Sequence, residues 1–200
     1  MNYFEYGQKE IEYLKNRDRK LGAKIDEISM LQRRIEPDIF SALISSIISQ
    51  QISTKAAITV KNRLIDLVGE ITPKNIAKLE IESIQKCGMS IRKANYIKEI
   101  GNVAINKTID FEGLHKLTDE EVIKELVKLK GVGEWTAEML LIHSLQRPNI
   151  LSYKDLGIRR GMMELYGLTE LSKDEFQVYK NRYSPYCTVA SLYLWEISSR

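Results

Sequence analysis

Apolar residues recur along most of the chain at intervals of three and four positions, which is the spacing of one helix face. One such face carries Phe40, Leu43, Ile44, Ile47 and Ile48. Another carries Ala56, Ala57, Val60, Leu64 and Leu67, and Gly69 follows it at the expected position of a C-cap. Alternation of apolar and polar residues is limited to stretches such as 149–153, which are too brief to build a sheet. The pattern therefore predicts an all-α protein.

Residues that cap helices stand before several of these stripes. The predicted helix starts are Thr72-Pro73, Ser90, Thr118 with Glu121, Ser172 with Glu175, and Ser184-Pro185. Together with the stripes they predict about ten helices joined by short loops. The first 36 or so residues look like a separate arm that packs onto the body.

Composition is that of an ordinary globular protein. The 200 residues are 44% hydrophobic and 28% charged, which is enough for one domain or for two small lobes. No apolar run reaches the roughly 18–20 residues that span a bilayer, and the charged N-terminus has no signal-peptide core. We expect a cytoplasmic protein with no membrane partner. Cys87 and Cys187 are too few for a disulfide framework or an iron–sulfur cluster, so both are expected to be buried.

Two glycines lie one residue apart in the segment 129–141, LKGVGEWTAEMLL, between a predicted helix over 119–130 and another over 134–145. Gly131 and Gly133 permit a tight hairpin whose N–H groups point outward at the start of a helix, where the helix dipole is also positive. Such main chain suits a phosphate and is indifferent to base sequence. The alternative is a plain helix–helix turn, in which glycine is also common.

The flanking sequence makes the hairpin more specific, and with four other segments it resembles a known family. The segments are LKGVGEWTAE at 129–138, QRPNILSYKDLGIRRG at 146–161, FSALISSIISQQISTKAA at 40–57, CGMSIRKANYI at 87–97 and SPYCTVASLYLWE at 184–196. The chain is identified by them as a member of the helix–hairpin–helix DNA glycosylases, within the 3-methyladenine DNA glycosylase II group. The resemblance covers residues 40 to 196.

The resemblance implies a fold, a function and a partner. The fold is a two-lobed helical bundle with a cleft between the lobes, one lobe being 38–147 and the other 1–37 together with 148–200. The function is hydrolytic excision of alkylated purines, 3-methyladenine and 7-methylguanine, from double-stranded DNA in base excision repair, by an enzyme acting as a monomer. Two alternatives stay open: a glycosylase for an oxidised or deaminated base, and a non-catalytic helix–hairpin–helix DNA-binding module.

Asp155 is the predicted catalytic residue. Cleavage of an N-glycosidic bond leaves positive charge on the sugar, which a carboxylate stabilises, and the same group can orient the attacking water. Spacing alone would make Asp155 a simple helix N-cap, and both roles are compatible. Bifunctional relatives carry a lysine where this chain has Trp135, so the resemblance implies a monofunctional enzyme without lyase activity.

The resemblance also assigns residues to base flipping, the step in which the target base leaves the duplex. Gln51 and Ile52 occupy the wedge position, with Gln51 where one branch has leucine. The base pocket is expected to include Trp135, Trp195, Tyr193 and Met139, with Tyr186 and Tyr153 as weaker candidates and core packing as the alternative for each aromatic. An electron-rich ring attracts a cationic methylated purine more than a normal base. Met139 and Cys187 replace an aromatic residue and an arginine of that branch, so the substrate list can differ.

The remaining assignments concern phosphates, ions and isolated residues. Phosphate binding is expected at Gly131, Val132, Gly133 and Thr136. The carbonyls of Val127, Leu129 and Val132 would hold a structural Na⁺ or K⁺, and no other cofactor is implied. Arg92, Lys93, Arg159 and Arg160 are phosphate contacts or parts of solvated helix faces. His115 and His143 have no partner at metal-ligand spacing, so we expect structural roles for them.

Overall fold

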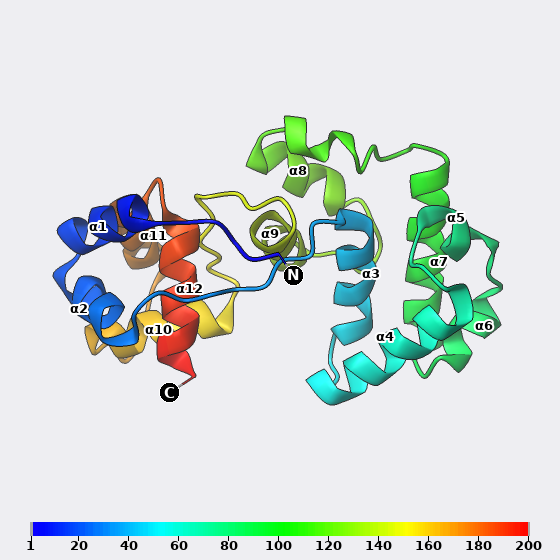
Figure 1. The fold of residues 1–200 in the computed structure, drawn as a ribbon, viewed down its shortest axis with the longest axis horizontal. Coiled ribbons are helices and arrows are strands. Elements are labelled where there is room, and N and C mark those ends of the chain that lie inside the picture. Colours follow the sequence, from blue (N-terminus) through cyan, green and yellow to red (C-terminus); the bar gives the residue numbers. More distant parts are fainter. Residues whose placement is uncertain (1, 200) are drawn as a thin grey trace. The chain divides into compact units, whose positions relative to one another are not determined.

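The computed structural model describes residues 2–199, and these residues form twelve α-helices and one 3-10 helix (Figure 1). They are α1 (Gln8–Arg17), α2 (Arg19–Ile28), α3 (Ile39–Ser49), α4 (Thr54–Val68), α5 (Pro73–Lys78), α6 (Ile81–Lys86), α7 (Ile91–Ile105), η1 (Gly113–Lys116), α8 (Asp119–Leu126), α9 (Glu134–His143), α10 (Leu156–Tyr166), α11 (Lys173–Tyr183) and α12 (Cys187–Ser198). Residues 2–199 contain no β-strand beyond one isolated bridge between Tyr3 and Arg34. The all-α prediction is confirmed.

The chain divides into two compact units. Unit 1 comprises residues 1–35 and 141–200, and unit 2 comprises residues 36–140. The sequence predicts the divisions after residues 37 and 147, whereas the second division falls inside α9. The reason is that the end of α9 packs with unit 1: Arg147 N donates to Leu141 O at 2.8 Å, and the His143 ring stacks on Trp195. A cleft between the lobes stays a prediction of the sequence.

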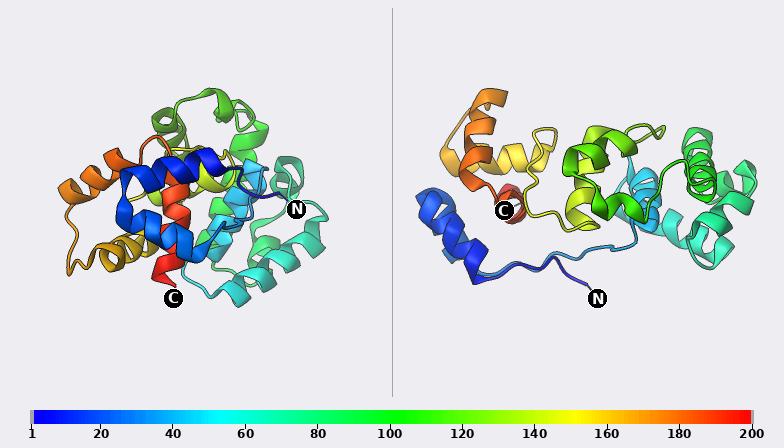
Figure 2. Two further views of the ribbon diagram at one scale, coloured as in Figure 1. Left: turned by 60° about the vertical axis from the view of Figure 1, so that its left-hand side comes forward. Right: turned by 90° about the horizontal axis from the view of Figure 1, so that it is seen from above.

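Unit 1 is built around α12, whose residues from Cys187 to Leu194 are all buried. Helices α1, α2, α10 and α11 pack against it (Figures 1 and 2). The approach of α10 is especially close, because a Cβ at Gly161 would overlap the carbonyl of Leu194. Cys87 in unit 2 and Cys187 here are both buried and free, and burial raises the pKa of the Cys187 thiol to about 12.

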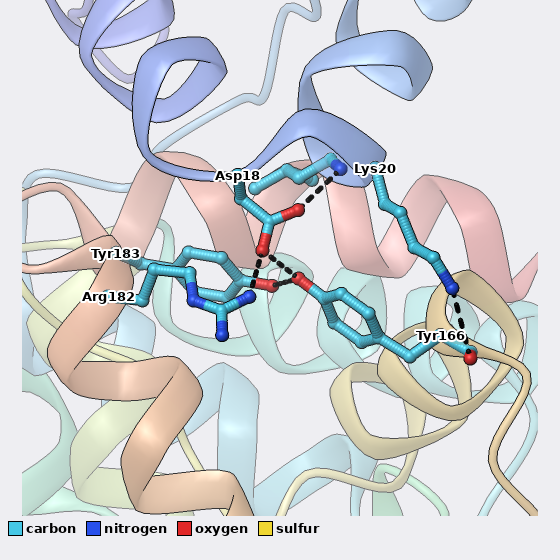
Figure 3. Close-up of polar contacts among 6 residues, drawn as sticks. Asp18, Lys20, Tyr166, Arg182 and Tyr183 are labelled. Atoms are coloured by element: carbon cyan, nitrogen blue, oxygen red, sulfur yellow. Dashed lines mark hydrogen bonds and ion pairs between the residues drawn. The ribbon is translucent and has the colours of Figure 1, made fainter.

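A buried polar network joins the N-terminal arm to the rest of unit 1 (Figure 3). The Asp18 carboxylate accepts hydrogen bonds from Leu21 N at 2.9 Å, from the Tyr166 hydroxyl at 2.6 Å and from Arg182 Nη1 at 2.6 Å. The Tyr183 hydroxyl lies 2.5 Å from that of Tyr166. Burial alone would raise the pKa of Asp18, but these donors outweigh it and lower the pKa below its ordinary value.

Unit 2 is organised by α3 and α7. Helix α3 packs against α4 and α7, and α7 also packs against α5 and α6. The predicted stripe Phe40, Leu43, Ile44, Ile47 and Ile48 is fully buried, as expected, but Leu67 of the second stripe is 45% exposed.

The predicted caps are confirmed with one exception. Thr72 and Ser90 accept from the third backbone N–H of their helices, and Thr118 with Glu121 and Ser172 with Glu175 form complete capping boxes. Ser184 is the exception, because it ends α11 and its hydroxyl accepts from Asn149 Nδ2 instead of capping α12. Helix α12 begins after Tyr186 without a side-chain cap.

Candidate active site and nucleic-acid interface

Asp155 stands at the N-cap of α10 and is 7% exposed. Its Oδ1 accepts a hydrogen bond from Ile158 N at 2.8 Å, which satisfies the start of the helix. The same oxygen accepts from Trp195 Nε1 of α12, also at 2.8 Å. Gly157 makes room for this contact, since a Cβ there would lie 2.9 Å from Trp195 Cδ1. The N-cap geometry and the indole therefore hold the carboxylate in one orientation.

Trp195 is half-buried and has two further neighbours in unit 1, neither of which the sequence connects with it. The His143 ring stacks on the indole with centroids 5.6 Å apart and an interplanar angle of 21°. The Arg33 guanidinium carbon lies 5.5 Å from the centre of the indole. Arg33 belongs to the N-terminal arm, and its backbone pairs with the start of that arm, since Phe4 N donates to Arg33 O at 2.9 Å. Asp155, Trp195, His143 and Arg33 thus form one cluster, called the Asp155 cluster below.

His143 is an uncharged member of this cluster at neutral pH. Burial and, to a smaller extent, the charge of Arg33 lower the pKa of His143 to about 4, although Asp155 opposes the shift. The sequence predicts a structural role for this histidine, and no periodicity or spacing links it to Asp155 or to Arg33. Only the fold brings the three together.

Tyr193 is predicted for the base pocket, and the structure shows where its side chain lies in unit 1. Its side chain is fully buried in the core of unit 1, and its hydroxyl donates to Ser29 O at 3.1 Å. Burial raises the pKa of this hydroxyl. The surroundings of the Tyr193 ring are those of core packing, the alternative given for each aromatic residue. Tyr153 and Tyr186 are both half-buried and pack against the same core.

The hairpin of unit 2 uses its two glycines differently. Gly131 has a φ of +84°, and a Cβ there would overlap the ring of Tyr96 on α7. Gly133 has no such φ and no neighbour within 4 Å of an added Cβ, and its carbonyl accepts from Ala137 N at 3.0 Å to begin α9. Glycine at 131 is therefore favoured by the conformation and packing of the hairpin, while Gly133 leaves the start of α9 open.

The side chains of the other predicted phosphate-binding residues point inward. Val132 is 6% exposed and Thr136 is 4% exposed. At these positions only the backbone is suited to meet a phosphate. For the predicted ion, the carbonyl of Leu129 accepts from Val132 N at 3.1 Å, and Val127 is the C-cap of α8. Residues 2–199 contain no group of three or more His, Cys, Asp or Glu side chains that could hold a metal ion.

The turn between α3 and α4 carries the predicted wedge residues. Gln51 has a φ of +57°, which is uncommon for a residue other than glycine. Ile52 is 40% exposed. Gln50 and Gln51 line a cavity of about 330 Å³ together with Tyr96 and Trp135, so the structure brings the wedge turn and Trp135 together within unit 2. Met139, on the same helix as Trp135, is half-buried.

Lys93, one of the candidate phosphate contacts, makes two hydrogen bonds within unit 2. Its Nζ donates to Ile48 O at 2.9 Å and to Gln50 O at 2.5 Å, at the C-terminal end of α3. Burial and the neighbouring Arg92 lower the pKa of this ammonium group.

Within residues 2–199, no helix has the length and apolar content needed to cross a membrane.

Comparisons with known proteins agree with these features. The model of the HhH-GPD superfamily of base excision DNA repair proteins matches residues 44–182. DNA-3-methyladenine glycosylase 1 of Schizosaccharomyces pombe is 35% identical over 164 residues, a match that covers 80% of this chain and 72% of that protein. A crystal structure of DNA-3-methyladenine glycosidase from Bacillus halodurans superposes with a TM-score of 0.88 at 34% identity, covering 99% of this chain and 93% of that one. The Schizosaccharomyces pombe 3-methyladenine DNA glycosylase Mag1, in complex with abasic DNA, gives 0.84 at 30% identity, covering 96% and 98%.

The chain belongs to the HhH-GPD superfamily of base excision DNA repair proteins. Within that superfamily, these relatives confirm the resemblance to the 3-methyladenine DNA glycosylase group.

Proposed function

We propose that this protein is a DNA glycosylase that hydrolyses the N-glycosidic bond of alkylated purines in double-stranded DNA during base excision repair. The observation that carries the proposal is the Asp155 carboxylate, whose Oδ1 receives Ile158 N–H and Trp195 Nε1–H. 3-Methyladenine is the expected first substrate and 7-methylguanine the next. The protein is proposed to act as a monomer, in the cytoplasm.

The chemistry assigned to Asp155 follows from charge. As the bond between the sugar and the purine lengthens, positive charge grows on the sugar ring, and a fixed carboxylate stabilises it without reorganisation. The same carboxylate can orient the water that attacks the sugar. Methylation gives the purine a positive charge before cleavage, which makes the base a better leaving group and a better ligand for an aromatic face. Trp195 and Trp135 are the aromatic residues assigned to base recognition, and Met139 is assigned to the same pocket.

The base reaches Asp155 only after it leaves the duplex, which costs a few kcal/mol. Gln51 and Ile52 are proposed to fill the space it vacates, and their exposure on a turn supports this role. The main chain at Gly131, Val132, Gly133 and Thr136 is proposed to hold a phosphate. A monovalent cation at the carbonyls of Val127, Leu129 and Val132 would help by adding positive charge there.

The first test is base release from duplexes that each contain one lesion: 3-methyladenine, 7-methylguanine, an oxidised guanine or a deaminated base. The expected result is release of the alkylated purines. Replacement Asp155→Asn should reduce release to background while DNA binding stays, because the amide keeps the cap but lacks the charge. A variant that still released the base at the wild-type rate would overturn the assigned mechanism.

The monofunctional assignment is tested with the same duplexes. Because Trp135 stands where a Schiff-base lysine would be, the product should be an intact strand with an abasic site, cut only after alkali. Borohydride should trap no covalent complex. Trapping, or strand cleavage without alkali, would contradict a purely hydrolytic reaction.

A further inference from the structure

The wedge turn is fastened to the rest of unit 2 from two sides. From α7, Lys93 Nζ donates to the carbonyls of Ile48 and Gln50 at 2.9 Å and 2.5 Å. Towards the hairpin, Gln50 Nε2 donates to Gly131 O at 2.8 Å. The residue that follows, Gln51, has a φ of +57°. The backbone is thus held in a rare conformation directly before the exposed Ile52.

The position of Lys93 is electrostatically suited to binding the carbonyls at the end of α3. The end of a helix carries carbonyls without intrahelical partners and the negative end of the helix dipole. An ammonium group offers three donors, and Lys93 directs donors to two carbonyls at this helix end. The residue is half-buried between α3 and α7, so it is not displayed on a solvated face as its neighbour Arg92 is.

The same chemistry occurs a second time on α7 at a place remote from the turn. Lys98 Nζ donates to Ala77 O at 2.7 Å and to Leu79 O at 2.5 Å, at the end of α5. Both lysines therefore join helices by capping a neighbour's carbonyls. Only Lys93 does so at the turn that carries the wedge residues.

Resting on the proposed function, in which Gln51 and Ile52 enter the duplex, we propose that Lys93 is a positioning residue that presets the wedge turn for insertion. Insertion has to offset the unstacking and unpairing of the target base. A turn that is already ordered loses little conformational freedom when it inserts, so more of the contact energy is left for extruding the base. Lys93 touches neither the sugar nor the base in this scheme.

The test compares Lys93→Met with wild type on a duplex containing one 7-methylguanine, under single-turnover conditions. The lesion is either paired with cytosine or placed in a one-nucleotide bulge, where it is already unpaired. The variant should release the paired base about 10-fold or more slowly, on the scale of freeing one or two backbone residues. For the bulged lesion the loss of rate should largely disappear, because the target base is already unpaired and does not need the wedge to extrude it. Lys93→Arg, which keeps the charge and the donors, should recover most of the rate.

Two controls separate this role from others. Lys98→Met removes an equivalent cap at α5 and should affect paired and bulged lesions equally, through folding alone. The salt dependence of binding to undamaged duplex should be the same for Lys93→Met and wild type. If Lys93 contacted a phosphate, its replacement would lower the slope of log K against log salt concentration by about one ion. If Lys93→Met does not fold, Gln50→Met removes the other fastening and should show the same difference between paired and bulged lesions.

The outcomes are distinct. A loss of equal size on both duplexes, a lowered salt slope, or no loss at all would overturn the positioning role. Wild-type protein that released no base from any lesion would instead overturn the proposed function.

Discussion

At the scale of single residues, the bond from Trp195 Nε1 to Asp155 Oδ1 gives the indole a task besides any contact with a base. Trp195→Phe keeps an aromatic surface and removes this donor. A hydrogen bond to a charged group contributes about 1.5–3 kcal/mol, so the single-turnover rate of base release should fall roughly 10- to 100-fold. The affinity for lesion-containing duplex should change much less, because the ring remains.

Trp195→Ala completes the comparison by removing ring and donor together. If phenylalanine supported the wild-type rate and alanine did not, stacking alone would explain the residue, and the hydrogen bond to Asp155 would have no part in catalysis. Circular dichroism and thermal melting of both variants would show whether the α12 core, to which the indole is attached, is intact.

His143 affects the same cluster through its lack of charge. With a pKa of about 4, the ring is neutral at pH 7 and adds no positive charge beside Arg33. A cationic methylated purine stacked near Trp195 would therefore meet one fixed cation in the Asp155 cluster, Arg33, together with the carboxylate. A protonated histidine at this position would repel such a base.

At the scale of elements, the two hairpin glycines offer a matched pair of substitutions. Gly131→Ala should destabilise unit 2 by about 2–4 kcal/mol, because it adds a positive-φ cost and a collision with Tyr96. Gly133→Ala should change stability by less than about 1 kcal/mol, since nothing lies within 4 Å of the new methyl group. Its effect should instead appear as weaker DNA binding, because the methyl group stands where main chain is proposed to meet phosphate.

Urea denaturation and duplex binding at one fixed salt concentration measure the two effects separately. Similar losses of stability for both alanine variants would mean that Gly133 is also a folding requirement. Unchanged DNA binding by Gly133→Ala would place the phosphate away from this part of the hairpin.

Local features of the elements could be predicted from sequence, and contacts between elements could not. The capping boxes at Thr118 and Ser172 follow from chemistry within four residues, and the buried face of α3 follows from periodicity. The reason for Gly131 is different, because the ring that excludes a side chain there belongs to Tyr96 on another helix. Lys93 likewise looks like a surface cation until the carbonyls of α3 are seen beside it.

The Asp155 cluster shows that contacts between elements of the site could not be predicted from sequence either. Asp155 and Trp195 are both predicted through the family resemblance, and the structure adds the bond between them. Arg33 comes from the N-terminal arm and His143 from the end of α9, and no motif joins those segments. Tyr193 shares the last helix with Trp195, yet two residues of helical rotation turn its ring into the core.

At the scale of the whole molecule, unit 1 has to be closed from two stretches of chain that are more than 100 residues apart in sequence. Asp18 of the arm, with Tyr166 and Arg182 of the C-terminal stretch, is the polar part of that closure (Figure 3). A carboxylate buried to this degree is tolerated because donors from both stretches meet it. The network therefore stabilises the docking of the arm, and with it the placement of Arg33.

Asp18→Asn should lower the free energy of unfolding at pH 7 by about 2–4 kcal/mol, since it leaves Arg182 without its buried anion. Because folding lowers the pKa of Asp18, the stabilisation is fully present above the ordinary pKa of 3.8 and is lost as pH falls through the lower folded value. The difference between wild type and variant, measured by urea denaturation, should thus be constant from pH 7 to about pH 5 and shrink below pH 4. Asp26→Asn on the same helix is the control, as its pair with Lys15 is 62% exposed on the Asp26 side and should contribute at most about 1 kcal/mol. Equal losses for the two variants, or a difference that persisted unchanged into acid, would mean that Asp18 does not stabilise unit 1 through its charge.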